Sequence, residues 1–449
     1  MVGRGSSEMS NSATSERSAG AARVADGDAA RAGRVSWRRV VVVMAWWLAF
    51  AVTRLVPLAL TLSPSLYGPD VSDPTGDLDR YAGWATAIVD EGQMPYRDVD
   101  VEYPPGSLPF VMLPAMVPGA DAEFSRLTFV ALMVALDASA FGVLLRLARR
   151  RSRSGSLRGA VTWLLLPPVL GVVLYARLDL IPAVALLFAL ERAYARGWFA
   201  SGVWLGLGTA AKLVPALFLP LWVLAAAGRR LRLIGGAVLA GLVAWLPFAR
   251  DTGELIHDVL GYHSARGIHL ESLWGSLLNL DRIAGGQPRL DFQFGAYHIV
   301  GPGADAMLRV TTLLSVAIVA VTALIAVLRW RRRPERARWE LPLAVTATLA
   351  LLLGTGRVFS PQFMIWLLAA AAVLFAVHPR IALWAGPLLL VIVVLTAAGY
   401  PLGFDLLRDG ARWPALVLVG RNGVVVALGL ALTLRWLWGV APPQEDTES

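Results

Sequence analysis

Two carboxylates begin a polar segment that follows the first long apolar run of the chain. Asp77 and Asp79 stand in GDLDRY, ahead of residues with apolar side chains at helical spacing. A carboxylate at the mouth of a cavity can act as a general base and take a proton from a hydroxyl group. Acids at a helix start also cap free N–H groups and complement the helix dipole. Because residues two apart on a helix do not share a face, we expect at most one catalytic acid.

Three charged residues occur in or between apolar segments. Lys212 is the only lysine among 41 basic residues, and it interrupts the apolar stretch GLGTAAKLVPALFLP. A charge inside a membrane segment is costly, so Lys212 is predicted to bind a phosphate, with a snorkelling surface residue as the alternative. Arg177 and Asp179, in YARLDLIP, either form a pair that caps a turn or bind substrate. In the second case Arg177 holds an anionic group and Asp179 orients it or another cation.

A further carboxylate stands directly before two prolines in VEYPPG. The prolines fix the chain direction and suit the start of a helix. A helix start does not explain Glu102, because a carboxylate beside hydrocarbon is costly unless it has a partner or a function. We expect Glu102 and Tyr103 to position a substrate.

Two later segments carry polar side chains next to apolar ones. YHSARGIHLES contains His263, Arg266 and Glu271, and GRVFSPQ contains Arg357 and Gln362. Serine, proline and glutamine are typical of a helix start, which is also a ready anion site. We expect the arginines to bind phosphate and the other three residues to position substrate. The histidine spacings match neither HExxH nor another ligand pattern, so we expect no metal site and no cofactor.

The segments that position these residues are those of a membrane protein. The chain has 449 residues, of which 56% are hydrophobic and 16% charged. Several apolar runs reach the ~20 residues that a bilayer crossing needs. The net charge of +9 comes from arginines at the ends of apolar runs, as in cytoplasmic loops, so we expect no nucleic-acid partner. The chain has no cysteine, which excludes disulfides and thiolate metal sites.

The distribution of arginines predicts the topology. Residues 1–38 are expected to be a disordered cytoplasmic tail, 39–438 a transmembrane domain and 439–449 a cytoplasmic tail. The fold class is all-α polytopic, with about 10 to 12 transmembrane helices, both termini inside and outer loops at 63–104 and 250–304. Residues 76–92 are predicted to form an amphipathic helix on the outer face, 105–118 a re-entrant segment or a half-length helix, and 198–227 one broken helix or two short ones. The candidate site residues outside the apolar segments fall on the outer face, whereas Lys212 lies within an apolar stretch.

The order of these motifs resembles a known family. GDLDRYAGWA, PYRDVDVEYPPG, RLDLIPA, GLGTAAKLVPALFLP, HSARGIHLESLWGSL and VFSPQFMIWLL occur in an order similar to that in the actinobacterial glycosyltransferase family 87, of the GT-C class. The resemblance covers about residues 40–400. It implies a GT-C-like helical bundle in the cell membrane that transfers α-mannose from polyprenyl-phosphate-mannose on the outer face, to a lipid or glycan acceptor. Because the family's catalytic acid lies soon after the first span, Asp77 matches it best, with Asp79 as the fallback.

The resemblance also implies a mechanism. A lipid phosphate is a good leaving group, so the reaction needs a base for the acceptor hydroxyl and cations for the phosphate. One carboxylate without a covalent intermediate predicts inversion at the sugar carbon. Two alternatives stay open: a flippase for lipid-linked sugars, which would place its polar residues at the bilayer midplane, and a polymer ligase with a lipid-diphosphate donor.

Overall fold

The computed structural model describes residues 37–149 and 157–442. The chain divides into two compact units, residues 1–53, described from Trp37 on, and residues 54–449. Helix α2 (Trp37–Leu62) runs from the first unit into the second. The predicted tails at 1–38 and 439–449 lie almost wholly outside the described residues.

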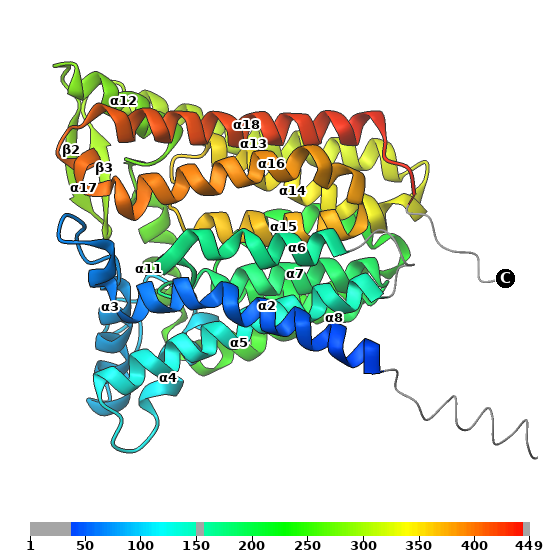
Figure 1. Cartoon of the computed structure of the whole chain (residues 1–449), viewed down its shortest axis with the longest axis horizontal. Helices are drawn as coiled ribbons and strands as arrows, with labels where there is room; N and C mark the ends of the chain where they lie inside the picture. Colours follow the sequence, from blue (N-terminus) through cyan, green and yellow to red (C-terminus); the bar gives the residue numbers. More distant parts are fainter. Residues whose placement is uncertain (1–36, 150–156, 443–449) are drawn as a thin grey trace, which may run out of the picture. The chain divides into compact units, whose positions relative to one another are not determined.

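Helices make up most of the unit that begins at Arg54, and the long ones run roughly parallel or antiparallel to one another (Figure 1). After α2 they are α3 (Gly76–Ala85), α4 (Leu108–Ala115), α5 (Ala122–Arg149), α6 (Leu157–Leu165), α7 (Leu180–Tyr194), α8 (Trp198–Ala211), α9 (Leu219–Ala225), α10 (Arg230–Trp245), α11 (Thr252–Ala265), α12 (Leu273–Ile283), α13 (Ala304–Trp330), α14 (Ala337–Thr355), α15 (Phe363–Val377), α16 (Pro379–Ala397), α17 (Phe404–Arg408) and α18 (Arg412–Trp438).

The prediction of an all-α polytopic membrane protein is confirmed. Within the described ranges, seven helices are long and apolar enough to cross a membrane, or eight if the pair Leu157–Leu165 and Pro167–Leu174, bent by 45°, forms one span. The predicted count was higher because it included α7, α8 and α15. These have only 14 or 15 residues each and fall below the length of a full crossing.

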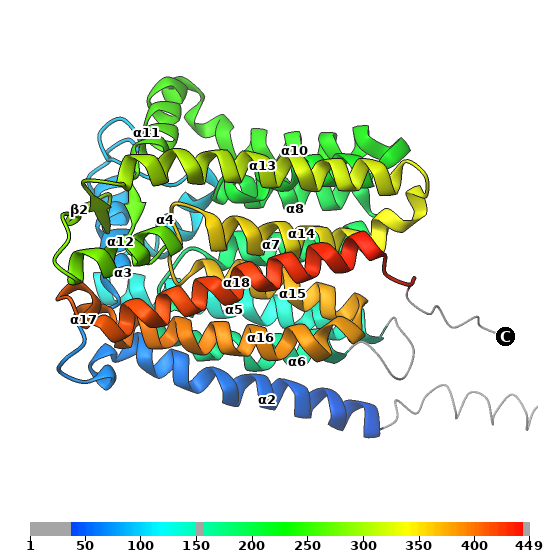
Figure 2. The same ribbon diagram turned by 90° about the horizontal axis from the view of Figure 1, so that it is seen from above.

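Helix α15 lies at the centre of this unit. Every residue of α15 is buried, and the helix packs against α5, α6, α7, α14 and α16. Its sequence FMIWLLAAAAVLFAV is apolar on all sides, as expected for a helix surrounded by other helices. In contrast, α10 and α13 leave most of their apolar residues uncovered, as a lipid-facing helix does. Figure 2 shows these two helices along one side, and α6 and α16 along the other.

The predicted break at Lys212 is confirmed. Helix α8 ends at Ala211, and Lys212 has an extended backbone before a 3₁₀ turn (Val214–Phe218) leads into α9. The turn that follows Pro104 packs on this end of α8. A Cβ atom at Gly106 would lie 2.7 Å from the carbonyl carbon of Ala210, so only glycine fits there. The YPPG turn and the break in α8 are therefore in direct contact.

The predicted amphipathic helix is α3, which buries Leu78, Tyr81 and Ala85. The half-length helix is α4, of eight residues. The sequence did not predict the small antiparallel sheet in the order β1-β3-β2, formed by β1 (Ile268–His269), β2 (Arg289–Gln293) and β3 (Ala296–Val300). Figure 1 shows α3, α17, β2 and β3 at the same end of the helices.

Candidate active site

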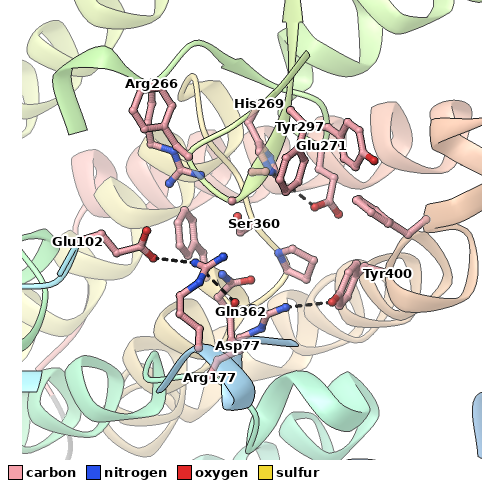
Figure 3. Close-up of a pocket in the computed structure, with 18 of the residues that line it drawn as sticks. Asp77, Glu102, Arg177, Arg266, His269, Glu271, Tyr297, Ser360, Gln362 and Tyr400 are labelled. Atoms are coloured by element: carbon pink, nitrogen blue, oxygen red, sulfur yellow. Dashed lines mark hydrogen bonds and ion pairs between the residues drawn. The ribbon is translucent and has the colours of Figure 1, made fainter. Parts of the chain in front are cut away.

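A cavity of about 190 Å³ lies among α3, the β2–β3 hairpin and the start of α15. Most of the residues that the sequence singles out line it, and Figure 3 shows how they converge from separate parts of the chain. These residues are Asp77, Glu102, Tyr103, Arg177, Lys212, Arg266, Glu271 and Gln362. The convergence brings carboxylates and cations from five separate segments to one cavity.

Asp77 lies in the first turn of α3, with its carboxylate directed into the cavity (Figure 3). It forms an ion pair with Arg177, and its Oδ1 lies 3.9 Å from Nη1 of Arg80. Arg177 in turn donates a hydrogen bond of 2.9 Å from Nη2 to the hydroxyl of Tyr400. Guanidinium groups on a carboxylate favour its charged form, the form that can accept a proton.

Asp79 does not line the cavity. Its side chain is 52% exposed and pairs with Arg126 of α5. The two acids point to different sides of α3 because they are two residues apart. Geometry therefore favours Asp77 over Asp79 as the acid that meets a substrate in this cavity.

Glu102 and Tyr103 form the wall that leads to the YPPG turn. Oε1 of Glu102 lies 3.4 Å from Nη1 of Arg80, so Arg80 stands between two carboxylates. The Tyr103 ring packs against Tyr81 and Trp84, with ring centroids 6.3 and 6.0 Å away. Burial raises the pKa of Tyr103 well above its usual range, so its hydroxyl stays protonated.

Lys212 reaches the cavity from the break after α8. Its Nζ lies 2.8 Å from Oδ1 of Asp179 and 5.1 to 5.2 Å from the ring centroids of Tyr103, Phe363 and Trp366. The ammonium is therefore held by one carboxylate and three rings, and Lys212 is only 8% exposed. This placement does not fit a snorkelling surface residue.

Of the two alternatives for Arg177 and Asp179, the pair that caps a turn does not form. Arg177 turns towards Asp77, whereas Asp179 turns towards Lys212 and is completely buried, without lining the cavity. Residues 177 and 179 stand in the turn that leads into α7, two positions apart, and their side chains leave in different directions. Asp179 thus acts on the cavity through Lys212.

The segment after α11 supplies Arg266, His269 and Glu271 to the cavity. Glu271 is 3% exposed, and burial raises its pKa to about 7. Its Oε1 has no hydrogen-bond partner among the described residues, and its Oε2 lies 3.9 Å from Nε2 of His269. Burial and the nearby Arg266 hold the pKa of His269 well below its usual range, so this ring is neutral.

Besides Asp79 and Asp179, one more described residue among those predicted, Arg357, does not line the cavity. Its backbone oxygen accepts a hydrogen bond from the His269 amide at 2.9 Å. The side chain of His263, on α11, lies outside the described part of the chain. Gln362, directly before α15, does line the cavity together with Ser360 and Pro361.

Sequence reasoning missed a polar pair behind Glu271. Arg421 and Asn422 of α18 are completely buried, and both donate hydrogen bonds to the backbone oxygen of Glu271. Both residues occur in the apolar span that contains VGRNGV. The arginine could have been recognised from the sequence, because a charged residue within a span indicates a function or a buried partner.

Sequence reasoning also missed Arg80 and the aromatic residues of the cavity wall. Phe292, Phe294 and Tyr297 come from the hairpin, and Tyr400 and Phe404 from the segment around α17. The alternation of apolar and polar residues in LDFQF and AYHIV was a signal for strands that could have been recognised.

Comparison with known proteins identifies the family. The family model of glycosyltransferase family 87 matches residues 102–361, more than half of the chain. The match begins at Glu102, so it includes Lys212, Arg266 and Glu271 but not Asp77. A comparison with curated proteins returned no match. Three observations agree with a membrane enzyme: helices that can span a membrane, a polar cavity at one end of these helices, and the family match. The chain belongs to glycosyltransferase family 87 and is a membrane glycosyltransferase.

Proposed function

We propose that the protein transfers mannose from a polyprenyl-phosphate donor to a hydroxyl of a lipid or glycan acceptor, with inversion, on the outer face of the cell membrane. The observation that carries this proposal is the meeting of one carboxylate, Asp77, with cations from three other segments in a single cavity. A carboxylate can accept the proton of the acceptor. The cations can stabilise the charge of a departing phosphate.

The proposed reaction is a single displacement. Asp77 accepts the proton of the acceptor hydroxyl while that oxygen attacks the anomeric carbon of the donor. The bond from this carbon to the phosphate oxygen breaks, and the oxygen keeps the electron pair. Lys212 and Arg266 then stabilise the phosphate, while Arg80 and Arg177 hold Asp77 in place. One attack from the face opposite the phosphate inverts the configuration.

The arginine distribution supports a cavity that opens to the outer side. Helix α13 begins four residues after β3, close to the cavity, and its 27 residues span about 40 Å. The sequence RRRPER at 331–336 therefore lies at the opposite end of the helices. Since arginine-rich short loops stay in the cytoplasm, the cavity is proposed to open to the outer side.

The experiment that tests this function uses membranes that contain the protein. We expect them to transfer label from polyprenyl-phosphate-[¹⁴C]mannose to an endogenous lipid or glycan. Asp77→Asn should abolish transfer with expression unchanged, whereas Asp79→Asn, at the exposed neighbour, should retain it. Full activity of Asp77→Asn would remove the base assignment, and transfer from GDP-mannose without a lipid carrier would remove the donor assignment. A flippase would move the donor without cleaving it.

A further inference from the structure

A buried ion pair lies among the membrane-spanning helices, outside the lining of the cavity. Arg54 of α2 forms it with Asp137, which stands near the middle of α5, and the two side chains are 2% and 0% exposed. Nε of Arg54 donates to one carboxylate oxygen at 2.9 Å, and its Nη2 donates to the other at 3.1 Å. Charges within a span are costly and usually have a function. The reaction proposed above does not use this pair.

The same guanidinium also bonds to the end of α6. Its Nη1 donates to the backbone oxygen of Leu164 at 2.7 Å, and its Nη2 donates to that of Trp163 at 2.9 Å. In a continuous helix these oxygens would accept from the N–H groups four residues later, but Pro167 and Pro168 have no N–H. Within a bilayer no water can take the place of the missing donors. Arg54 therefore replaces the two N–H groups that the prolines lack.

The prolines mark a bend of 45° between α6 and the 3₁₀ helix Pro167–Leu174. After the bend, Gly171 has φ 60° and ψ −132°, and a Cβ atom at this position would overlap the hydroxyl of Tyr67. That hydroxyl accepts a hydrogen bond of 3.0 Å from the Val172 amide. The path of this irregular segment is thus fixed by side chains from other parts of the chain.

The irregular segment ends at Tyr175, two residues before Arg177. Tyr175 is completely buried, and its hydroxyl donates a hydrogen bond of 2.7 Å to Oδ2 of Asp137. Oδ1 of Asp137 accepts a further hydrogen bond of 2.7 Å from Nε1 of Trp163. Asp137 therefore bonds to both ends of the bent segment, and Arg177 follows directly on the end that Tyr175 fixes.

We propose that Arg54 and Asp137 are positioning residues for the transfer reaction. Arg54 stabilises the bend after α6, and Asp137 anchors Tyr175. Together they direct the guanidinium of Arg177 towards Asp77. The inference rests on the proposed function, in which Asp77 is the base, and adds two residues within the spans that act on this base through Arg177.

The pH dependence of the maximal rate distinguishes this role from support of the fold alone. A variant that only lowers the amount of folded enzyme reduces the rate by the same factor at every pH. A variant that displaces Arg177 takes positive charge away from Asp77, so the acidic limb of the profile should move up by about 1 pH unit. The other acidic, basic and imidazole side chains that line the cavity are unchanged in such a variant: Arg80, Glu102, Lys212, Arg266, His269 and Glu271.

Two variants test the proposal in membranes that contain the protein, with labelled polyprenyl-phosphate-mannose as the donor. Arg54→Lys keeps the charge but loses the planar group that bonds to Asp137 and to both carbonyl oxygens together. Tyr175→Phe removes only the hydroxyl that bonds to Asp137, and it leaves the ion pair in place. Both variants should move the acidic limb to higher pH.

The matched control lies at the opposite end of the helices. Arg329 bonds through two nitrogens to the completely buried Glu340 and donates from Nη1 to the backbone oxygen of Leu437 at 2.9 Å. It is thus also an arginine that joins a buried carboxylate to a helix end, but it is not part of the cavity lining. Arg329→Lys should lower the thermal midpoint and leave the acidic limb where it is in the wild type.

Arg177→Gln calibrates the measurement, because it removes the charge beside Asp77 directly. An unmoved limb in this variant would count against Asp77 as the base, and the inference would fail with the proposed function. If the limb moves in Arg177→Gln but not in Tyr175→Phe, the inference alone is overturned, whatever the result for Arg54→Lys. An equal shift in Arg329→Lys would also overturn it, since the effect would then not depend on the segment before Arg177.

Discussion

Arg177 forms an ion pair with Asp77 across 100 positions of sequence, joining the turn before α7 to the first turn of α3. Both side chains are 15% exposed, so the pair is shielded from water but open to the cavity. Arg177 also bonds to the hydroxyl of Tyr400, which ties α3 to the segment before α17. The orientation of the proposed base thus depends on three separate segments.

This relationship predicts the effect of changing Arg177. Arg177→Lys keeps the charge but loses the planar group that contacts Asp77 and Tyr400 together, so the maximal rate of transfer should fall about 10- to 100-fold. The measurement is the initial rate at saturating donor and acceptor. Arg126→Lys is the matched control, because Arg126 pairs with the more exposed Asp79. Equal rates for Arg177→Lys and the wild type would show that the pair does not position the base.

The buried pair of Lys212 and Asp179 predicts a loss of stability. Asp179→Ala leaves the ammonium without its carboxylate, and removal of one partner of a buried pair costs about 3 to 5 kcal/mol. The thermal midpoint in detergent should therefore fall clearly. Asp98→Ala, which breaks the exposed pair with Arg97, should change the thermal midpoint much less. The double variant Asp179→Leu/Lys212→Met should recover part of the stability without recovering activity.

Glu271 predicts a pH dependence of stability. Its pKa is about 7 in the folded protein against 4.5 as its ordinary value, so the folded state holds this proton over a pH range in which the unfolded chain has released it. The contribution of Glu271 to the free energy of unfolding is therefore complete below pH 4.5. It declines as the pH rises to about 7, by about 3 kcal/mol in total. Thermal midpoints between pH 5 and pH 8 measure it. Glu271→Gln should remove this component, and a variant with the same decline would contradict the assignment.

Phe294 predicts a gain of stability from substitution. Phe294 and Gly295 form the two-residue loop between β2 and β3, and both have positive φ. Asparagine accepts positive φ more readily than phenylalanine, and Asn-Gly is the preferred pair for this loop, so Phe294→Asn should stabilise the hairpin by about 1 kcal/mol. A higher thermal midpoint would be the expected result. Gly295→Ala, at the adjacent position, should have the opposite effect. It should lower the thermal midpoint, because the added Cβ atom meets Arg80. A lower midpoint for Phe294→Asn would mean that the ring, and not the backbone, decides stability here.

Much of the fold could be predicted because membrane segments are encoded locally. An apolar run with arginines at its ends, as in α13, is sufficient to mark a span. The break at Lys212 was predictable because a lysine and a proline interrupt one apolar stretch. The number of full spans was not predictable from the sequence. Helices α7 and α15 are as apolar as a full span, but the positions where they end, Tyr194 and Val377, depend on packing.

The sequence predicted which residues line the cavity better than it predicted which residues form pairs with one another. Topology was sufficient to predict that Asp77, Glu102 and Glu271 lie on one face, and the structure brings them to one cavity, together with Lys212 from the break after α8. It did not reveal that Asp179 would pair with Lys212 and not with Arg177, because side-chain directions in a turn depend on local backbone angles. The contact between Tyr297 and Phe404 in the cavity wall was missed because the two residues come from a hairpin and a short helix, which meet only in the folded chain.

The complete burial of α15 has a consequence for how the protein responds to its bilayer. Changes in hydrocarbon thickness strain helices that touch lipid, and α10 and α13 are among the described helices that leave most of their apolar surface uncovered. Gln362 precedes α15, and Asp179 precedes α7, so the cavity rests on helices that are shielded from such strain by their neighbours. Hydrophobic mismatch would tilt the peripheral helices first and leave the spacing between Asp77 and Lys212 largely unchanged.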